Sequence, residues 1–332
     1  MEELLSELKR IKDKVNTEIS RIKNSLVYPK ELYEAAFHLL SKGGKRLRPF
    51  VLIKSTELFS GDVNLALPVA VSVELLHNFT LIHDDIMDQD EMRRGVKTTH
   101  VIWGVPIAMT AGDALFALLF KYLVEELKRK GMEPDKIASI TEIIADGAIK
   151  VCEGQTMDVL AQDYIKTEDD YFEMVSKKTS TLFRISAMLG GLVAGADEKS
   201  QELLSLYGEN LGISFQIADD ILGLVGDPKI TGKPLGSDLR EGKRTIIVLH
   251  ALKSLSKTNK MKIKAVLGNR NVSETQILEV IDILKQAGSI DYAREKARKF
   301  AEKAVEYLSN LPDNDHRKYL EMLAKFTYTR QM

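Results

Sequence analysis

The chain has 332 residues, of which 44% are hydrophobic and 29% charged. This composition is typical of a folded globular protein and excludes a collagen-like or disordered chain. Its 47 basic and 48 acidic residues leave a net charge of −1, which excludes a whole-protein basic field for nucleic acid. The single cysteine, Cys152, excludes an intrachain disulfide and a multi-thiolate zinc site, so a reducing cytoplasm is the simplest location.

Helical periodicity begins at the N-terminus, where Leu4, Leu8, Ile11 and Val15 recur at steps of three and four residues. This segment is charged throughout and lacks the apolar core of a signal peptide. Further apolar patterns predict helices over residues 31–41, 48–59, 65–90, 106–130, 135–162, 168–194, 198–223, 243–256, 274–286, 288–309 and 314–328. The most membrane-like stretch, 101–120, contains glycine, proline and aspartate, so we expect no stable membrane insertion.

Local start signals support three of these helices. Pro134 precedes an acid, Thr167-x-x-Asp170 resembles a cap, and Ser273-x-x-Gln276 is a capping-box pattern. No run shows the strict alternation of strands between hairpin turns, and no linker rich in glycine, serine or proline divides the chain. We therefore predict one all-α domain over residues 1–332.

The first chemical motif is LLHNFTLIHDDIMD (75–88), an apolar helix that ends in Asp84, Asp85 and Asp88. Asp84 and Asp88 lie one turn apart on one face. Carboxylates crowded there repel one another unless cations lie between them, and oxygen ligands at this spacing suit Mg²⁺ together with substrate phosphates and water. A solvated acidic helix end is the alternative for such a motif met alone.

A second apolar helix, GISFQIADDILG (212–223), delivers Asp219 and Asp220 in the same way. Two buried helices that both end in paired acids are hard to explain structurally, because burying an unpaired carboxylate costs several kcal/mol. Facing each other across a cavity, the two pairs would form one polynuclear metal site.

Basic residues occur near both motifs and in the Gly-rich segment 226–244. They are Lys45, Arg46, Arg48, Arg93, Arg94, Lys177, Lys178, Lys233 and Lys243. Taken singly, such residues are more often solvated surface cations. Beside metal-binding acids they suggest two polyanions held side by side, because Arg and Lys both bind phosphate. A diphosphate leaving group in an apolar, water-excluding interior implies carbocation chemistry on a hydrocarbon.

In this order, the motifs GGKRLRP (43–49), LLHNFTLIHDDIMDQDEMRRG (75–95), GISFQIADDILG, TGKP (231–234) and SDLREGK (237–243) resemble those of the trans-isoprenyl diphosphate synthases. The resemblance covers nearly the whole chain and is strongest to archaeal-type short-chain geranylgeranyl diphosphate synthases. It implies an isoprenoid-synthase-type helical bundle around a deep apolar cavity, a cytoplasmic homodimer, and two to three Mg²⁺ ions per active site. The implied reaction joins isopentenyl diphosphate to dimethylallyl, geranyl or farnesyl diphosphate, gives geranylgeranyl diphosphate (C20) and releases diphosphate.

The resemblance also implies roles for individual residues. Metal binding falls to Asp84, Asp85, Asp88, Asp219 and Asp220, with Asp219 preferred as the direct ligand of the second pair. The residues implied to bind isopentenyl diphosphate are Lys45, Arg48, His77 and Arg94. The residues implied to bind the allylic diphosphate are Arg93, Lys178, Lys233 and Lys243. Thr179 and Gln216 are implied to flank the forming cation.

A chain-length ruler is implied at Phe79, with Thr80 and Leu76 beside it and Trp103 as a further candidate. One aromatic residue about 7.5 Å before Asp84 along the helix matches the pattern for a C20 product. An ideal helical wheel nevertheless places Phe79 away from the Asp84 face, so core packing is a competing interpretation.

One position departs from the family pattern. Many relatives have a third acid in the second motif where this chain has Gly223, and Asp227 or Asp238 is a candidate substitute. Four alternatives stay open: a bifunctional farnesyl/geranylgeranyl diphosphate synthase, a terpene cyclase, an HD-type metal phosphohydrolase suggested by His83 and Asp84, and a non-enzymatic partner subunit.

Overall fold

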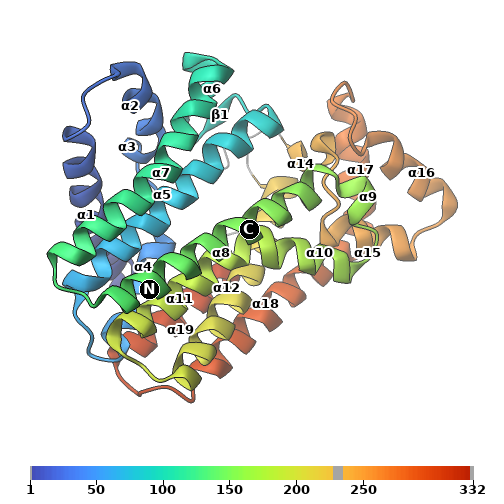
Figure 1. Cartoon of the computed structure of the whole chain (residues 1–332). Helices are drawn as coiled ribbons and strands as arrows, with labels where there is room; N and C mark the ends of the chain where they lie inside the picture. Colours follow the sequence, from blue (N-terminus) through green and yellow to red (C-terminus); the bar gives the residue numbers. More distant parts are fainter. Residues whose placement is uncertain (1, 227–234, 330–332) are drawn as a thin grey trace. The chain divides into compact units, whose positions relative to one another are not determined.

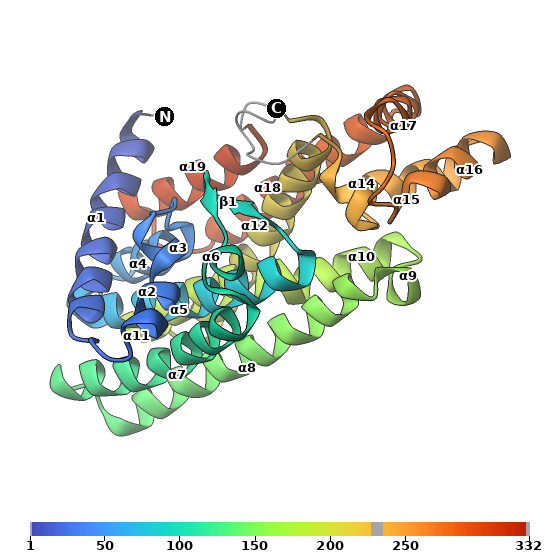
Figure 2. The same ribbon diagram turned by 90° about the horizontal axis from the view of Figure 1, so that it is seen from above.

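The computed structural model describes residues 2–226 and 235–329 (Figures 1 and 2). These residues are predominantly helical, which confirms the all-α fold class. The helices are α1 (Glu2–Asn24), α2 (Lys30–Ala36), α3 (His38–Ser41), α4 (Leu47–Leu58), α5 (Val63–Asp88), α6 (Thr99–Trp103), α7 (Val105–Arg129), α8 (Pro134–Val159), α9 (Ala161–Tyr164), α10 (Glu168–Val175), α11 (Thr181–Ala194), α12 (Glu198–Val225), α14 (Ser237–Glu241), α15 (Ile246–Ser254), α16 (Lys257–Val266), α17 (Glu274–Gln286), α18 (Ser289–Leu308) and α19 (Asp315–Thr329). A π-helical turn, η1 (Ser176–Ser180), separates α10 from α11.

The chain divides into two compact units. Unit 1 comprises Met1–Ile149, Leu182–Gly208 and Glu306–Leu323. Unit 2 comprises Lys150–Thr181, Glu209–Val305 and Ala324–Met332. The single-domain organisation expected from the sequence stays a prediction.

In unit 1, α5 and α7 lie side by side (Figures 1 and 2). Helix α5 begins at a cap in which the Asp62 side chain accepts a hydrogen bond from the backbone N–H of Asn64. Its middle is buried on every face, and its residues there are apolar apart from Ser72 and Glu74. Both helices are long and apolar enough to cross a membrane by length and composition alone, although 67% of the apolar window of α5 and 39% of that of α7 are buried. Burial of this extent in α5 is what a core helix shows.

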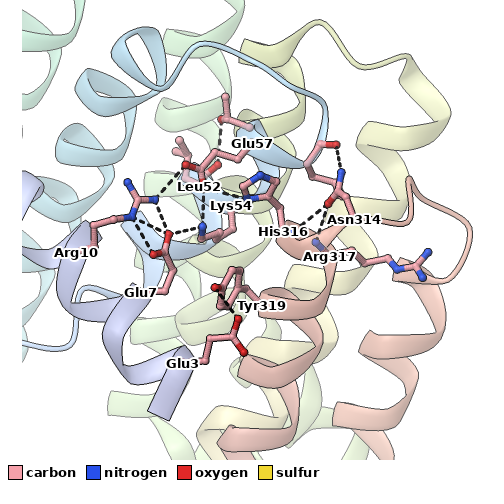
Figure 3. Close-up of polar contacts among 12 residues, drawn as sticks. Glu3, Glu7, Arg10, Leu52, Lys54, Glu57, Asn314, His316, Arg317 and Tyr319 are labelled. Carbon is pink, nitrogen blue, oxygen red and sulfur yellow. Dashed lines mark hydrogen bonds and ion pairs between the residues drawn. The ribbon is translucent and has the colours of Figure 1, made fainter. Parts of the chain in front are cut away.

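A polar cluster joins α1, α4 and α19 within unit 1 (Figure 3). The ammonium of Lys54, only 1% exposed, pairs with Glu7 and, at 2.7 Å, with Glu57. It also lies 4.6 Å from the ring centroid of Tyr319, and Arg10 bridges the same two carboxylates. Burial alone would raise the pKa of Glu7, but hydrogen bonds and positive charge from Arg10 and Lys54 hold it at about 2. The N-terminal helix is therefore tied to α4, which carries part of the candidate site.

Unit 2 has its own apolar core, in which Ile217 and Ile221 of α12 pack with Tyr171 of α10. The predicted helix 168–194 exists but contains η1, and π-helical turns often occur at functional sites. Two glycines allow neighbouring helices to approach η1. A Cβ on Gly154 of α8 would collide with the backbone of Lys178, and one on Gly212 of α12 would lie 2.5 Å from the Cα of Ser180.

Short-range signals predicted the helix starts well. Helix α8 begins at Pro134, and capping boxes are present at Thr167 and Ser273. A two-stranded antiparallel hairpin, β1 (Met92–Arg93) and β2 (Val96–Lys97), was not predicted, because two residues per strand are too few to show alternation. The short helices α6, α9, α14 and α16 were also not predicted.

Candidate active site

The first acidic motif lies at the C-terminal end of α5, in unit 1, and its carboxylates are not equivalent. Asp85 is fully buried and accepts a short ion-paired hydrogen bond from Nε of Arg93. The side chain of Asp84 keeps 19% exposure and lies 3.8 Å from Nη2 of Arg93, and Asp88 is half-buried. Burial raises the pKa of Asp85 to about 7, against the opposing effect of the Arg93 charge. Asp84 and Asp88 thus remain accessible on one face, whereas Asp85 points into the protein.

The hairpin that follows positions two arginines. Arg94 and Gly95 form its loop, and both have positive φ, as the central residues of a type I′ turn do. The Arg94 guanidinium donates to the backbone carbonyl of Gly43 and to that of Leu39. It also lies 3.1 Å from the position that a Cβ on Gly44 would occupy. The glycines of GGKRLRP therefore leave room for this arginine.

Three of the four residues predicted to hold isopentenyl diphosphate are close together in unit 1. Nη1 of Arg48 lies 3.2 Å from Nε2 of His77, and its guanidinium lies 4.6 Å from the ring centroid of Phe183. Burial, followed by the charges of Arg48 and Arg94, lowers the pKa of His77 well below its usual value. Because Arg can only donate, neutral His77 accepts at Nε2. Lys45, the fourth residue, is exposed.

Arg46, which lies between Lys45 and Arg48 in the GGKRLRP motif, has a different role. It is 3% exposed, pairs with Glu74 and donates to the carbonyl oxygen of Leu40 at 2.7 Å. Its φ of 52° places it in the left-handed region, directly before α4. Arg46 fixes the start of α4, and with it the direction in which Arg48 leaves the helix.

The predicted ruler residue Phe79 is half-buried and packs against aromatic side chains. Its ring centroid lies 4.7 Å from that of His83 and 5.0 Å from that of Phe116 on α7. Thr80 is half-buried, whereas Leu76 is fully buried. Both interpretations of Phe79 have a basis, because the ring joins an aromatic cluster and the residue is only half-buried.

The second acidic motif lies on α12, in unit 2, and repeats the division seen in the first. Asp220 is 6% exposed and accepts at Oδ2 from the Tyr171 hydroxyl at 2.6 Å and at Oδ1 from Nε2 of Gln216 at 2.7 Å. Asp219 is half-buried. Burial and the charge of Asp238 raise the pKa of Asp220 to about 7, against the hydrogen bonds from Tyr171 and Gln216.

Turn η1 presents the predicted cation-flanking residues within the same unit. Oγ1 of Thr179 donates to Oε1 of Gln216 at 2.6 Å. Nζ of Lys178 donates to Asp158 of α8 at 2.6 Å, and Lys243 pairs with Glu241 at 2.8 Å.

The predicted residue Lys233, with the motif TGKP, lies outside the described residues, as does Asp227. Asp238, the other candidate for the missing third acid, lies within the described residues. Its Oδ2 lies 2.5 Å from the position that a Cβ on Gly223 would take. A carboxylate from α14 therefore occupies the space into which a side chain at position 223 would extend.

Within the described ranges, no three His, Cys, Asp or Glu side chains are arranged to hold a metal ion. In the first motif, Asp85 points into the protein, so only the carboxylates of Asp84 and Asp88 share the accessible face. Mg²⁺ is commonly bound by one or two carboxylates together with substrate phosphates and water, rather than by an all-protein cage. The accessible pair Asp84 and Asp88, one helical turn apart, fits an ion bound in that way.

Two polar residues of the site were missed by the sequence analysis. Tyr171 appeared only as part of an apolar helix, and its bond to Asp220 spans 49 positions. Asp158 is far in sequence from Lys178, its partner across η1. Neither contact has a local sequence signal.

Comparison with known proteins shows the family to which the chain is related. The polyprenyl synthetase family model matches residues 29–284. A geranylgeranyl diphosphate synthase of Saccharolobus solfataricus is 43% identical over 321 residues, covering 96% of each chain. The crystal structure of a geranylgeranyl pyrophosphate synthetase from Pyrococcus horikoshii matches with a TM-score of 0.91 and 42% identity over 99% of each chain. A polyprenyl synthase from Caulobacter crescentus, complexed with calcium and isoprenyl diphosphate, matches with a TM-score of 0.89 and 30% identity over 99% of this chain and 98% of that one.

This chain therefore belongs to the polyprenyl synthetase family. The family and the prenyltransferase class predicted from the sequence motifs are both confirmed.

Proposed function

We propose that this protein condenses isopentenyl diphosphate with allylic diphosphates (dimethylallyl, geranyl and farnesyl) and releases geranylgeranyl diphosphate. The observation that carries the proposal is the presence of accessible carboxylates at the ends of α5 and α12 in a chain 43% identical to a geranylgeranyl diphosphate synthase. The bifunctional C15/C20 synthase stays the second candidate, since both make the same bonds.

Mg²⁺ is the expected cofactor, and Asp84, Asp88 and Asp219 are the proposed ligands. Supporting this, each is more accessible than the neighbouring Asp85 or Asp220, and the Caulobacter relative was crystallised with a divalent cation and isoprenyl diphosphate. When bound, the metal would supply positive charge that stabilises the leaving diphosphate. Asp85 and Asp220, predicted as further ligands, are proposed to act instead through Arg93 and Gln216, the residues that they contact.

Isopentenyl diphosphate is proposed to bind Lys45, Arg48, His77 and Arg94. The geometry supports this because Arg48, neutral His77 and Arg94 lie close together in unit 1, where charge-assisted hydrogen bonds would be strong. Arg93, Lys178 and Lys243 are proposed for the allylic diphosphate, with Lys233 as in the sequence-based prediction. Phe79 is proposed to limit the product to C20, supported by its partial exposure and by its packing against Phe116.

Asp238 is proposed to supply the acid that is missing at Gly223. Its carboxylate lies at the place where a side chain at position 223 would begin, and its charge acts on Asp220.

We also propose a cytoplasmic homodimer. Its support is an apolar surface along α6 and the start of α7, where large side chains are 37–49% exposed: Val101, Ile102, Val105, Ile107 and Met109. Exposed apolar side chains gathered along one segment are typical of interaction sites. Light scattering on the purified protein gives the oligomeric state directly. A monomer at micromolar concentration would contradict this part.

The test of function is a product assay with labelled isopentenyl diphosphate, each allylic primer in turn, and Mg²⁺ or chelator. We expect metal-dependent C20 product from wild type, none from Asp84→Ala, and wild-type rates from Asp146→Ala, which removes an exposed acid from α8. Circular dichroism of Asp84→Ala checks that it is folded. Full activity of Asp84→Ala would overturn the metal assignment, and absence of product with every primer would favour the cyclase, phosphohydrolase or partner-subunit alternatives.

A further inference from the structure

Four side chains of unit 2 form a continuous series of hydrogen bonds, here called the relay: Tyr171, Asp220, Gln216 and Thr179. The Tyr171 hydroxyl donates to Oδ2 of Asp220 at 2.6 Å, and Nε2 of Gln216 donates to Oδ1 at 2.7 Å. At the other end, Oγ1 of Thr179 donates to Oε1 of Gln216 at 2.6 Å. Three elements, α10, α12 and η1, are thereby connected.

The direction of the relay is imposed by Asp220. Oδ1 and Oδ2 of Asp220 both accept, from Gln216 and from Tyr171, so the Gln216 amino group faces Asp220 and its oxygen faces Thr179. The hydroxyl proton of Thr179 is then committed to Gln216. The Thr179 oxygen presents only lone pairs to any further neighbour, which stabilises a positive charge there and disfavours a diphosphate oxygen.

Burial makes Tyr171 the anchor of the relay. Tyr171 is 1% exposed and Asp220 is 6% exposed, so water is a poor substitute for either partner. Gln216 and Asp220 are four residues apart on α12, a spacing that brings their side chains together. Without the Tyr171 hydroxyl, Oδ2 of Asp220 would lose this buried donor, and the carboxylate would no longer be held in the orientation that meets Gln216.

We propose that Tyr171 is a positioning residue for ionisation of the allylic substrate: through Asp220 it fixes the Gln216 amide so that Thr179 Oγ1 meets the developing cation as an acceptor only. The inference rests on the proposed function, because it needs an allylic diphosphate that ionises beside Thr179. A relay that acts on the cation changes the rate of the chemical step and leaves diphosphate affinity alone.

The first test is Tyr171→Phe, which removes one hydroxyl and keeps the ring. We expect kcat to fall roughly 10- to 100-fold, with both KM values within about threefold of wild type. Tyr207→Phe is the matched control, because Tyr207 is also fully buried but donates to the backbone carbonyl of Leu320 at 2.9 Å. Its kcat should equal that of wild type. A Tyr171→Phe enzyme with wild-type kcat overturns the relay.

A double-mutant cycle separates positioning from a general loss of stability. Thr179→Val removes the hydroxyl at nearly constant shape, and Thr179→Ser keeps it and should retain most of the activity. If Tyr171 acts through the relay, adding Tyr171→Phe to Thr179→Val should lower kcat by less than about twofold further. Losses that multiply would show that Tyr171 acts elsewhere, and thermal unfolding of each variant reports its stability independently of activity.

Calorimetric titration with inorganic pyrophosphate and Mg²⁺ distinguishes the relay from a metal-site role. Its affinity should be the same for wild type and Tyr171→Phe. A loss of more than about tenfold would mean that Tyr171 orients Asp220 for the metal, which overturns the inference. A wild-type protein that makes no condensation product would overturn the proposed function and this inference with it, whereas an active wild type with an equally active Tyr171→Phe overturns the inference alone.

Discussion

Gly223→Asp restores the acid that many relatives have in the second motif, and we expect it to lower the free energy of unfolding of this protein. The Cβ of any residue at 223 would lie 2.5 Å from Oδ2 and 3.1 Å from Cγ of Asp238. Forcing an extra group into a packed site costs about 1–3 kcal/mol. Two carboxylates about 4 Å apart add a repulsion of about 4 kcal/mol at an effective dielectric constant of about 20. Without Mg²⁺ the variant should therefore lose about 5–7 kcal/mol of unfolding free energy.

Urea denaturation followed by circular dichroism, with and without Mg²⁺, measures this loss, and the product assay measures its effect on catalysis. Gly223→Ala isolates the steric part and should cost about 1–3 kcal/mol. In Gly223→Asp with Asp238→Ala, the clash and the repulsion both disappear, so stability should return to within about 1 kcal/mol of wild type. A Gly223→Asp protein as stable as wild type without Mg²⁺, or losses that simply add in the double variant, would refute the placement of Asp238.

Three further predictions follow from other parts of the molecule. Phe79→Ala should shift the products beyond C20 by opening space beside Phe116, and an unchanged product length in chromatography would leave Phe79 as a packing residue. Lys45→Ala should raise KM for isopentenyl diphosphate more than for the allylic substrate, unlike Lys42→Ala from the same exposed loop, and the opposite ranking would mean that the two substrate assignments are exchanged. The folded-state pKa of Glu7, about 2, lies below the ordinary glutamate value of 4.5. Its stabilising effect is therefore present above pH 4.5 and is lost as the pH falls toward 2. With allowance for partial solvent screening, Glu7→Gln should remove about 1–2 kcal/mol of that pH dependence, and identical acid-unfolding curves would contradict this.

The long helices and the acidic motifs could be predicted because their signals are local. The apolar run before Asp84 determines that α5 is buried, and the Ser273–Gln276 capping box lies within four consecutive residues. In each acidic pair, the different directions of the neighbouring carboxylates could not be predicted. Asp85 turns inward because Arg93 approaches from a hairpin, and a hairpin with two residues per strand leaves no periodic pattern.

Contacts between residues distant in sequence could not be predicted either. Tyr171 reads as one more apolar position in its helix, and only the packing of α10 against α12 brings its hydroxyl to Asp220. Asp238 was one of two candidates for the missing acid. Choosing between them requires the backbone of α14, because Gly223 leaves the space that Asp238 occupies.

The approach of Gly154 and Gly212 to turn η1 also constrains how the chain can be recombined. Each position requires glycine, because a Cβ there would collide with backbone that lies elsewhere in the sequence, at Lys178 and at Ser180. A chimera that exchanges α8 alone with a segment carrying alanine at 154 would displace the turn that holds Thr179. Segments Lys150–Thr181 and Glu209–Val225 should therefore be inherited together, and crossover points between related chains should be sought outside them.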